Sequence, residues 1–151
     1  MKNLRKIIQE YLKAIHPRVY FQIAPSNAQY PYITYDISSI SADGEGMERV
    51  VIDIDGWDLP SNGDSTTLET LMENINSINK AILRGNNIQA VLYLDTKLAP
   101  IDDDKRIIRR RYTYEAKVFG ADIESAWKDY GKLTWEKLYW KDYGKLTWEK
   151  L

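Results

Sequence analysis

The strongest constraint on the fold is a pair of neighbouring segments, residues 31–38 and 48–57, in which apolar and polar side chains alternate. This period of two is typical of strands that bury one face. In the second segment, one face carries Val50, Ile52 and Ile54, and the other carries Val51, Asp53, Asp55 and Trp57. The connecting SADGEG sequence contains Gly44 and Gly46, which can adopt positive φ in a turn. We therefore predict an antiparallel hairpin over these two segments.

Helical periodicity appears on both sides of this hairpin. The first apolar stripe, which predicts a helix over residues 3–15 ended by Pro17, consists of Leu4, Ile7, Ile8, Tyr11, Leu12 and Ile15. In the second helical segment, Asp64, Ser65 or Thr66 can cap the N-terminus, and Thr66 with Glu69 matches a capping box. Its stripe consists of Leu68, Leu71, Met72, Ile75, Ile78 and Ile82. It predicts a helix from Thr66 to a left-handed end at Gly85.

Three further segments have strand character, namely residues 19–23, 88–94 and 105–119. The last segment sorts its side chains clearly: one face carries Ile108, Tyr112, Tyr114, Ala116 and Val118, and the other carries Arg109, Arg111, Thr113, Glu115 and Lys117. The order of elements predicts an α+β fold. We expect a mostly antiparallel sheet of about five strands, with two helices packed on one face and a C-terminal appendage.

The C-terminal end differs from the rest of the chain. The twelve-residue sequence WKDYGKLTWEKL occupies residues 127–138 and recurs unchanged at 140–151. Two copies fall short of the three or more that a solenoid needs. A spacing of 13 residues also rotates the aromatic sets apart by about 140° on a single helix. We therefore predict one domain over residues 1–120 and a separate tail over 121–151.

Composition argues against several classes of function. The chain has no cysteine, so disulfides and thiolate metal sites are excluded. Its 21 basic and 22 acidic residues give a net charge of −1, which offers no electrostatic basis for membrane or sequence-specific nucleic acid binding. No apolar run reaches the roughly 20 residues of a membrane span, and the N-terminus lacks a signal-peptide core. We expect a protein made in the cytoplasm.

Motifs for catalysis and metal binding are incomplete. DIDG at residues 53–56 resembles the D-x-D-G opening of haloacid-dehalogenase-type phosphotransferases. In that family the first carboxylate is a nucleophile, but Trp57 replaces the expected Thr or Val, and a downstream lysine motif is missing. The alternating aspartates also lack the glycine offset and closing glutamate of a calcium loop. His16, beside Pro17, has no catalytic partner motif. We expect no enzyme activity, no cofactor and no metal.

Charged and aromatic residues instead indicate an interaction surface. The chain has 11 Tyr and 5 Trp, residue types that suit interfaces. Arg109 and Arg111 share one face of a predicted strand, whereas Arg110 lies on the other. Two interpretations remain open: a solvated face that pairs with the nearby acidic loop, or a charged seam between subunits. The candidate subunit or tube interface consists of Trp57, Asp102, Asp103, Asp104, Arg109 and Arg111.

Residues 3–119 resemble the tail-terminator or tail-completion proteins of long-tailed bacteriophages. The resemblance rests on the leading helix, APSNAQYPYITYDI, VVIDIDGW, the STTLETLMENINSINKAI helix and the closing strand pair. It implies a hexameric ring that caps the head-proximal end of the tail tube, stops its polymerisation and joins it to the head connector. The implied partners are further copies of the chain, the tail tube protein and the head–tail connector protein.

The resemblance also implies a location in the virion tail, after assembly in the cytoplasm of the host bacterium. The alternative is an intracellular protein-binding module, monomeric or dimeric, without a role in a phage. A phosphotransferase or hydrolase built on DIDG is the less favoured third interpretation. The native mass of the purified protein distinguishes the tail-terminator interpretation from the binding-module interpretation, because only a tail terminator requires a closed oligomer.

Overall fold

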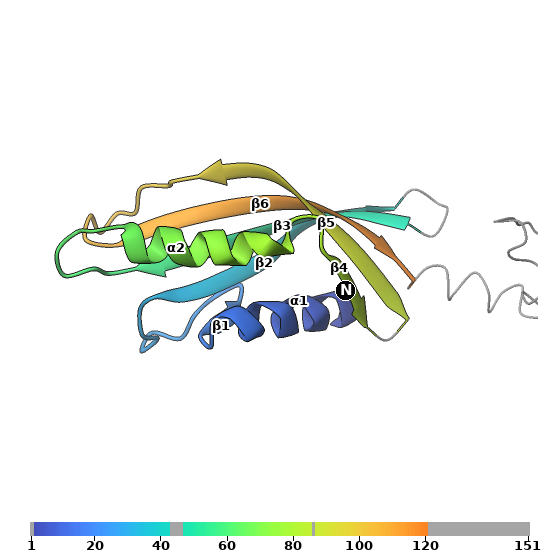
Figure 1. The fold of residues 1–151 in the computed structure, drawn as a ribbon, viewed down its shortest axis with the longest axis horizontal. Helices are drawn as coiled ribbons and strands as arrows, with labels where there is room; N and C mark the ends of the chain where they lie inside the picture. The colour runs from blue at the N-terminus through green and yellow to red at the C-terminus, as the bar shows by residue number, and fades with distance from the viewer. Residues whose placement is uncertain (1, 43–46, 86, 121–151) are drawn as a thin grey trace, which may run out of the picture.

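A six-stranded sheet forms the centre of the molecule, with strand order β1-β2-β3-β6-β5-β4 (Figure 1). The computed structural model describes residues 2–42, 47–85 and 87–120. Its elements are α1 (Lys2–Ile15), β1 (Val19–Phe21), β2 (Tyr32–Ala42), β3 (Met47–Asp58), α2 (Thr66–Ile75), the 3-10 helix η1 (Asn76–Ile78), β4 (Ile82–Gly85), β5 (Ile88–Leu98) and β6 (Ile108–Phe119). The predicted α+β class is confirmed. The sheet is mixed, because β1 pairs with β2 in parallel, and it has one strand more than predicted.

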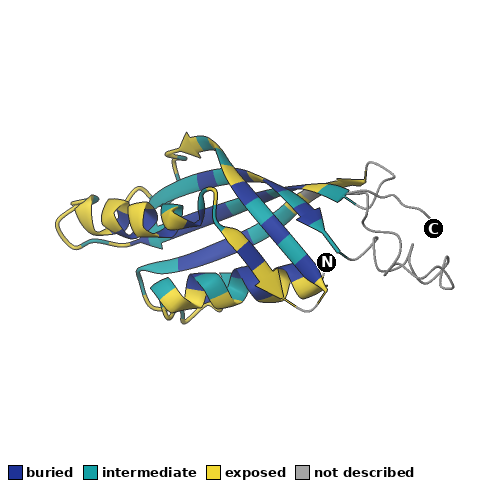
Figure 2. Ribbon diagram, turned by 45° about the vertical axis from the view of Figure 1, so that its right-hand side comes forward, coloured by how far each residue is buried: buried dark blue, intermediate teal, exposed yellow. Residues whose placement is uncertain are grey.

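The core lies between the sheet and the two helices, which both cover the same face (Figure 1). Val50, Ile52 and Ile54 of β3 are fully buried, as their shared face predicts. Against them pack the buried residues of the helices, which are Leu4, Ile7, Ile8 and Leu12 of α1 and Leu68, Leu71, Met72 and Ile75 of α2. Figure 2 shows the resulting alternation of buried and more exposed residues along the strands. The period of two therefore sets which face receives the helices.

The predicted helix from Thr66 to Gly85 is wrong in its second half. The α-helix ends at Ile75 and η1 ends at Ile78, after which Asn79 is extended (ψ 122°) and Lys80 has a φ of 66°. The chain then forms β4, in which Gly85 pairs with Ile88 instead of capping a helix. Asparagine and serine are poor helix formers, so the NSIN sequence yields readily to pairing with β5. Sheet pairing thus outweighs the continuous apolar stripe.

Asn79 stabilises this change of direction. Its side-chain Oδ1 accepts a hydrogen bond from the Leu94 amide at 2.8 Å, and the Lys80 amide donates to the Leu92 carbonyl at 2.6 Å. Ile78 remains fully buried, but Ile82 is 53% exposed on β4. The last residue of the predicted stripe therefore lies outside the core.

Of the three predicted caps of α2, the structure has Ser65, whereas the capping box of Thr66 and Glu69 is wrong because the helix begins one residue earlier than that motif requires. Ser65 is the N-cap residue, and its hydroxyl donates to Glu69 Oε2 at 3.1 Å. Thr66 instead donates from its amide and its hydroxyl to Asp64 Oδ1, at 3.0 and 2.7 Å. Side chains of the preceding loop thus supply contacts that we assigned to a reciprocal pair.

The strand boundaries differ from the predicted ones mainly next to loops. The predicted hairpin is confirmed and β2 extends to Ala42, whereas Gly44 and Gly46 lie outside the described residues. β5 continues to Leu98, and β6 begins at Ile108 rather than at residue 105. Residues 121–151, which include both copies of the repeat, also lie outside the described part. Within the described ranges, no helix has the length and apolar character needed to cross a membrane.

Candidate interaction surface

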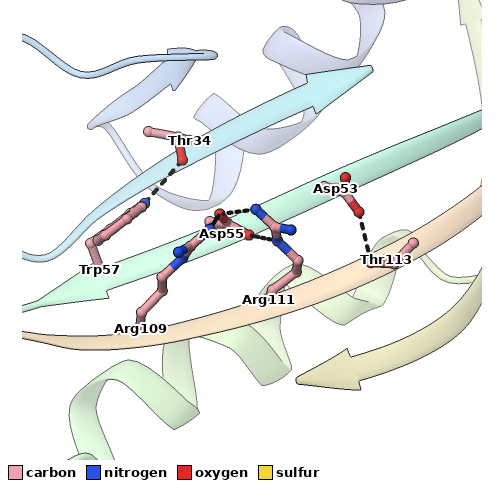
Figure 3. Close-up of polar contacts among 7 residues, drawn as sticks. All are labelled: Thr34, Asp53, Asp55, Trp57, Arg109, Arg111 and Thr113. Carbon is pink, nitrogen blue, oxygen red and sulfur yellow. Dashed lines mark hydrogen bonds and ion pairs between the residues drawn. The ribbon is translucent and has the colours of Figure 1, made fainter. Parts of the chain in front are cut away.

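The face of the sheet opposite the helices carries a connected set of charged and aromatic side chains. The antiparallel register of β3 and β6 places Asp55 opposite Arg111 and Trp57 opposite Arg109. Because side chains alternate along a strand, these four residues point to the same, helix-free face. Figure 3 shows them together at one part of this face. We call the set of Tyr32, Thr34, Asp55, Trp57, Arg109 and Arg111 the open-face cluster.

Asp55 is the centre of the open-face cluster. Arg109 donates to Asp55 Oδ2 from Nη2 at 2.7 Å and from Nε at 3.2 Å. Arg111 donates from Nε to Oδ1 at 2.8 Å and from Nη2 to Oδ2 at 3.0 Å (Figure 3). The Asp55 side chain is only 8% exposed although no helix covers it, because the two guanidinium groups enclose it. One carboxylate faces two permanent cations, which leaves a net positive charge in this group.

The aromatic side chains extend the cluster across β2. The Arg109 guanidinium lies over the Trp57 ring, 4.5 Å from its centroid, and the Trp57 indole donates to Thr34 Oγ1 at 3.0 Å. Trp57 also stacks on Tyr32, with ring centroids 6.1 Å apart. Tyr20 and Tyr30 contact Tyr32 in turn, at 6.0 and 5.1 Å. Rigid aromatic rings beside arginine are the composition of energetic centres in protein interfaces.

Electrostatic effects connect part of the acidic loop to this cluster. The pKa of Tyr32 is raised to about 12, chiefly by burial and then by Tyr30, with a further contribution from the charge of Asp102. Asp104 forms an ion pair with Arg106, in which Oδ2 lies 2.8 Å from Nη2. Hydrogen bonds donated by Arg106 lower the pKa of Asp104 to about 2. Asp103 is exposed. Of the predicted interface residues, the structure thus brings Trp57, Arg109 and Arg111 into contact, with Asp102 near Tyr32.

The interpretation that Arg109 and Arg111 pair with the acidic loop is wrong, because both bind Asp55 on β3. Arg110 lies on the helix face as predicted, and its Nη2 lies 3.1 Å from Glu69 Oε2 on α2. Sequence reasoning missed Thr34, Tyr32 and the burial of Asp55. A signal for Asp55 exists only in the register, which sets it opposite an arginine, and register cannot be read from one strand alone.

The DIDG segment has structural contacts at each of its polar positions. Asp53 Oδ1 accepts a 2.7 Å hydrogen bond from the Thr113 hydroxyl, and Asp55 holds the two arginines. A Cβ at Gly56 would lie 2.6 Å from the Met72 sulfur, so the glycine permits the close approach of α2. The described ranges contain no group of three His, Asp or Glu side chains arranged to hold a metal ion.

The lone histidine contacts the main chain at the start of β2. His16 Nε2 lies 2.8 Å from the Pro31 carbonyl oxygen, and Arg18 Nε donates to the same oxygen at 3.0 Å. These contacts hold the start of β2 against the end of α1. His16 therefore contributes to the scaffold that positions the start of β2.

Comparison with known proteins identifies a shared fold. No family model matches the chain, and no curated protein is significantly similar to it. Among solved structures, a chain from the virion of a native gene transfer agent particle superposes with a TM-score of 0.65 at 15% identity, over 79% of this chain and 96% of that one. A second solved chain gives a TM-score of 0.55 at 16% identity, over 78% of this chain and 91% of that one. At these identities, the similarity shows the fold alone.

Proposed function

We propose that the chain is a structural component of a phage or phage-like particle, and more narrowly a tail-completion protein. The observation that supports this most is the similarity to a chain of a gene transfer agent virion, which covers nearly all of that chain. The sequence resemblance to phage tail terminators agrees with it. Both lines of support concern the α+β domain and not the C-terminal tail.

In this proposal, copies of the chain assemble head to tail into a hexameric ring. The ring caps the head-proximal end of the tail tube, stops its polymerisation and presents a surface to the head–tail connector protein. Assembly takes place in the cytoplasm of the host bacterium, and the finished ring lies in the virion tail. The protein acts through its surfaces in this role, so it needs no catalytic group, cofactor or metal.

The open-face cluster supplies the contact surface in this proposal. Trp57 and Arg109 form a partly buried, rigid pair, and the guanidinium groups of Arg109 and Arg111 outnumber the Asp55 carboxylate. Asp36 and Asp53 lie beside the arginines on the same face, so the surface suits a partner that presents both charges with good shape complementarity. The acidic loop with Asp102, Asp103 and Asp104 provides a second, oppositely charged contact nearby. We assign Trp57, Arg109, Arg111 and the three aspartates of the acidic loop to contacts with a neighbouring subunit or with the tail tube.

Localisation in purified particles tests the proposed function. Antibodies against the α+β domain should label particles from the organism that carries this gene at a single point, between head and tail. Tryptic peptides of the chain should be found in the same particles. Labelling along the whole tail, or particles without these peptides, contradicts the assignment as a tail-completion protein and favours the binding-module alternative.

A charge reversal tests the assignment of the surface. Arg109→Glu should lower stability but leave the domain folded, because Arg111 still pairs with Asp55, and it should weaken assembly by placing a negative charge beside Asp55. Lys105→Glu is the matched control, since Lys105 is an exposed residue of the preceding loop. Assembly is measured by sedimentation of both variants beside the unaltered chain, alone and in the presence of tail tubes. Equal assembly of all three proteins contradicts a role for the open-face cluster.

A further inference from the structure

The two outer edges of the sheet are each paired with another strand over only part of their length. On one side, β1 pairs with Ile33–Tyr35 of β2, and Gln22 continues this contact through its amide, which donates to the Tyr35 carbonyl at 2.8 Å. On the other side, β4 pairs with β5 only as far as Val91, followed by a bridge from Asn79 to Leu92. Among the described residues, no strand pairs with residues 37–42 of β2 or with 95–98 of β5 on these outer edges.

The open part of β2 lacks most of the features that keep an edge strand from pairing. Its sequence, ISSISA, contains no charged residue and no proline. Natural edges are usually protected by short strands, charges, prolines or bulges. A bulge does separate Ile37 from Ser39, but residues 40–42 beyond it resume a regular register with β3. Ile40 is 40% exposed at this edge. An uncharged edge of this kind is a template for another strand.

The two open segments lie at diagonally opposite corners of the sheet. One row across the sheet consists of Ile37, Ile52, Tyr114 and Leu94. β2 is open on one side of this row, towards Ala42, and β5 is open on the other side, towards Leu98. The short strands β1 and β4 fill the two remaining corners (Figure 1). Each outer edge of the sheet therefore has one half that is paired with a short strand and one half that is unpaired. The paired halves of the two edges lie at opposite ends of the strands.

This arrangement is self-complementary for copies in the same orientation. β2 and β5 run in opposite directions, since three antiparallel pairings connect them, so β5 of a second copy can add to β2 as an antiparallel strand. A shift of four residues along the strands sets Thr96 of that copy opposite Ser41. In this arrangement, β2 of the first copy lies end to end with β4 of the second copy. Likewise, β5 of the second copy lies end to end with β1 of the first copy.

The shift is compatible with a closed ring. Four residues correspond to about 14 Å along a strand. Because β4 and β1 lie in line with β2 and β5 of neighbouring copies, successive copies are four strand spacings apart, about 19 Å across the sheet. These values tilt the strands by about 35° from the ring axis, which lies at the lower end of the roughly 35–45° found in closed barrels. A heterologous contact whose rotation closes gives a ring instead of a filament.

We propose that a second copy of this chain adds its β5 edge to the β2 edge, so that the sheets of neighbouring subunits become continuous. The inference rests on the proposed ring and specifies the contact through which it closes. The open-face cluster lies on a face and not on an edge, so it stays available to the tail tube. The expected joint is a main-chain ladder, with Ser41 and Thr96 on its helix-free side.

Cysteine cross-linking tests this contact cleanly, because the natural chain has no cysteine. Full-length Ser41→Cys and Thr96→Cys are prepared as separate proteins, mixed and oxidised. The mixture should give a disulfide-linked heterodimer, and each protein alone should give none. A chain with both substitutions should form covalent oligomers, since three strand spacings, about 14 Å, prevent a disulfide within one chain. Ser61→Cys, in an exposed turn, replaces Ser41→Cys as the control.

Each result has a defined meaning. A homodimer of Ser41→Cys alone shows a two-fold pairing of β2 edges and overturns the proposal. No cross-link in a protein whose native mass is that of a ring overturns the edge contact and leaves the proposed function standing. No cross-link in a monomeric protein overturns both. Ile40→Lys should abolish the heterodimer by charging the edge, whereas Leu59→Lys, which is equally exposed at 40%, should retain it.

Discussion

Asp55 shows how a single buried carboxylate can organise a face of a sheet that no helix covers. Its substitution by Asn leaves Arg109 and Arg111 beside a neutral partner that cannot accept four charge-assisted hydrogen bonds. Asp55→Asn should lower the free energy of unfolding by about 2–3 kcal/mol, as measured by urea denaturation. Asp53→Asn is the control on the same strand face and should cost less than about 1 kcal/mol, because Asp53 binds one hydroxyl. Equal losses contradict this account.

The raised pKa of Tyr32 predicts that the folded chain loses stability at alkaline pH. Burial, followed by the effect of Tyr30, raises its pKa to about 12 in the folded state, compared with the ordinary value of 10.0. A group whose pKa is raised by folding contributes its full stability below pH 10 and loses it as the pH rises towards 12. The folded chain should therefore become less stable over this range, and Tyr32→Phe should reduce that loss. Urea denaturation at successive pH values measures it, and identical slopes in both proteins contradict the prediction.

At the scale of elements, local periodicity was sufficient wherever one face of an element is buried. The faces of β3 and β6 were predicted correctly because a strand with one buried face must alternate. The length of α2 was not predictable in this way, since the apolar residues up to Ile82 fit a helix as well as a helix followed by a strand. Pairing of Ile82 with Val91 decides between them, and that contact is set by tertiary structure. The buried Asp55 escaped prediction for the same reason.

Two aspartate substitutions distinguish the observed α2 from the longer predicted helix. Leu71 is a buried residue of α2, and Leu71→Asp should unfold the domain, because an unpaired buried charge costs several kcal/mol. Ile82 is largely exposed on β4, so Ile82→Asp should lower the stability by less than about 1 kcal/mol. Circular dichroism and urea denaturation of both variants provide the comparison. Unfolding by Ile82→Asp would support the longer helix.

At the scale of the whole molecule, the described residues up to Gly120 form a six-stranded sheet, two α-helices and a buried core. We therefore expect removal of residues 121–151 to shift the melting temperature by only a few degrees, about 1 kcal/mol or less. Removal of residues 140–151 alone, which leaves one copy of the repeat, should change still less. Thermal unfolding of the three forms measures this. A shortened chain that fails to fold shows that the domain boundary at residue 120 is misplaced.

The central claim is that this domain is a ring-forming part of a phage-like particle, and the mass of the native protein tests it most directly. Native mass spectrometry of the full-length chain should show a closed oligomer, expected as a hexamer of about 106 kDa, six times the 17.6 kDa chain. The peak should sharpen at one mass as the concentration rises, without a ladder of larger species. A mass of 17.6 kDa at every concentration, or an open series of ever larger assemblies, contradicts the account.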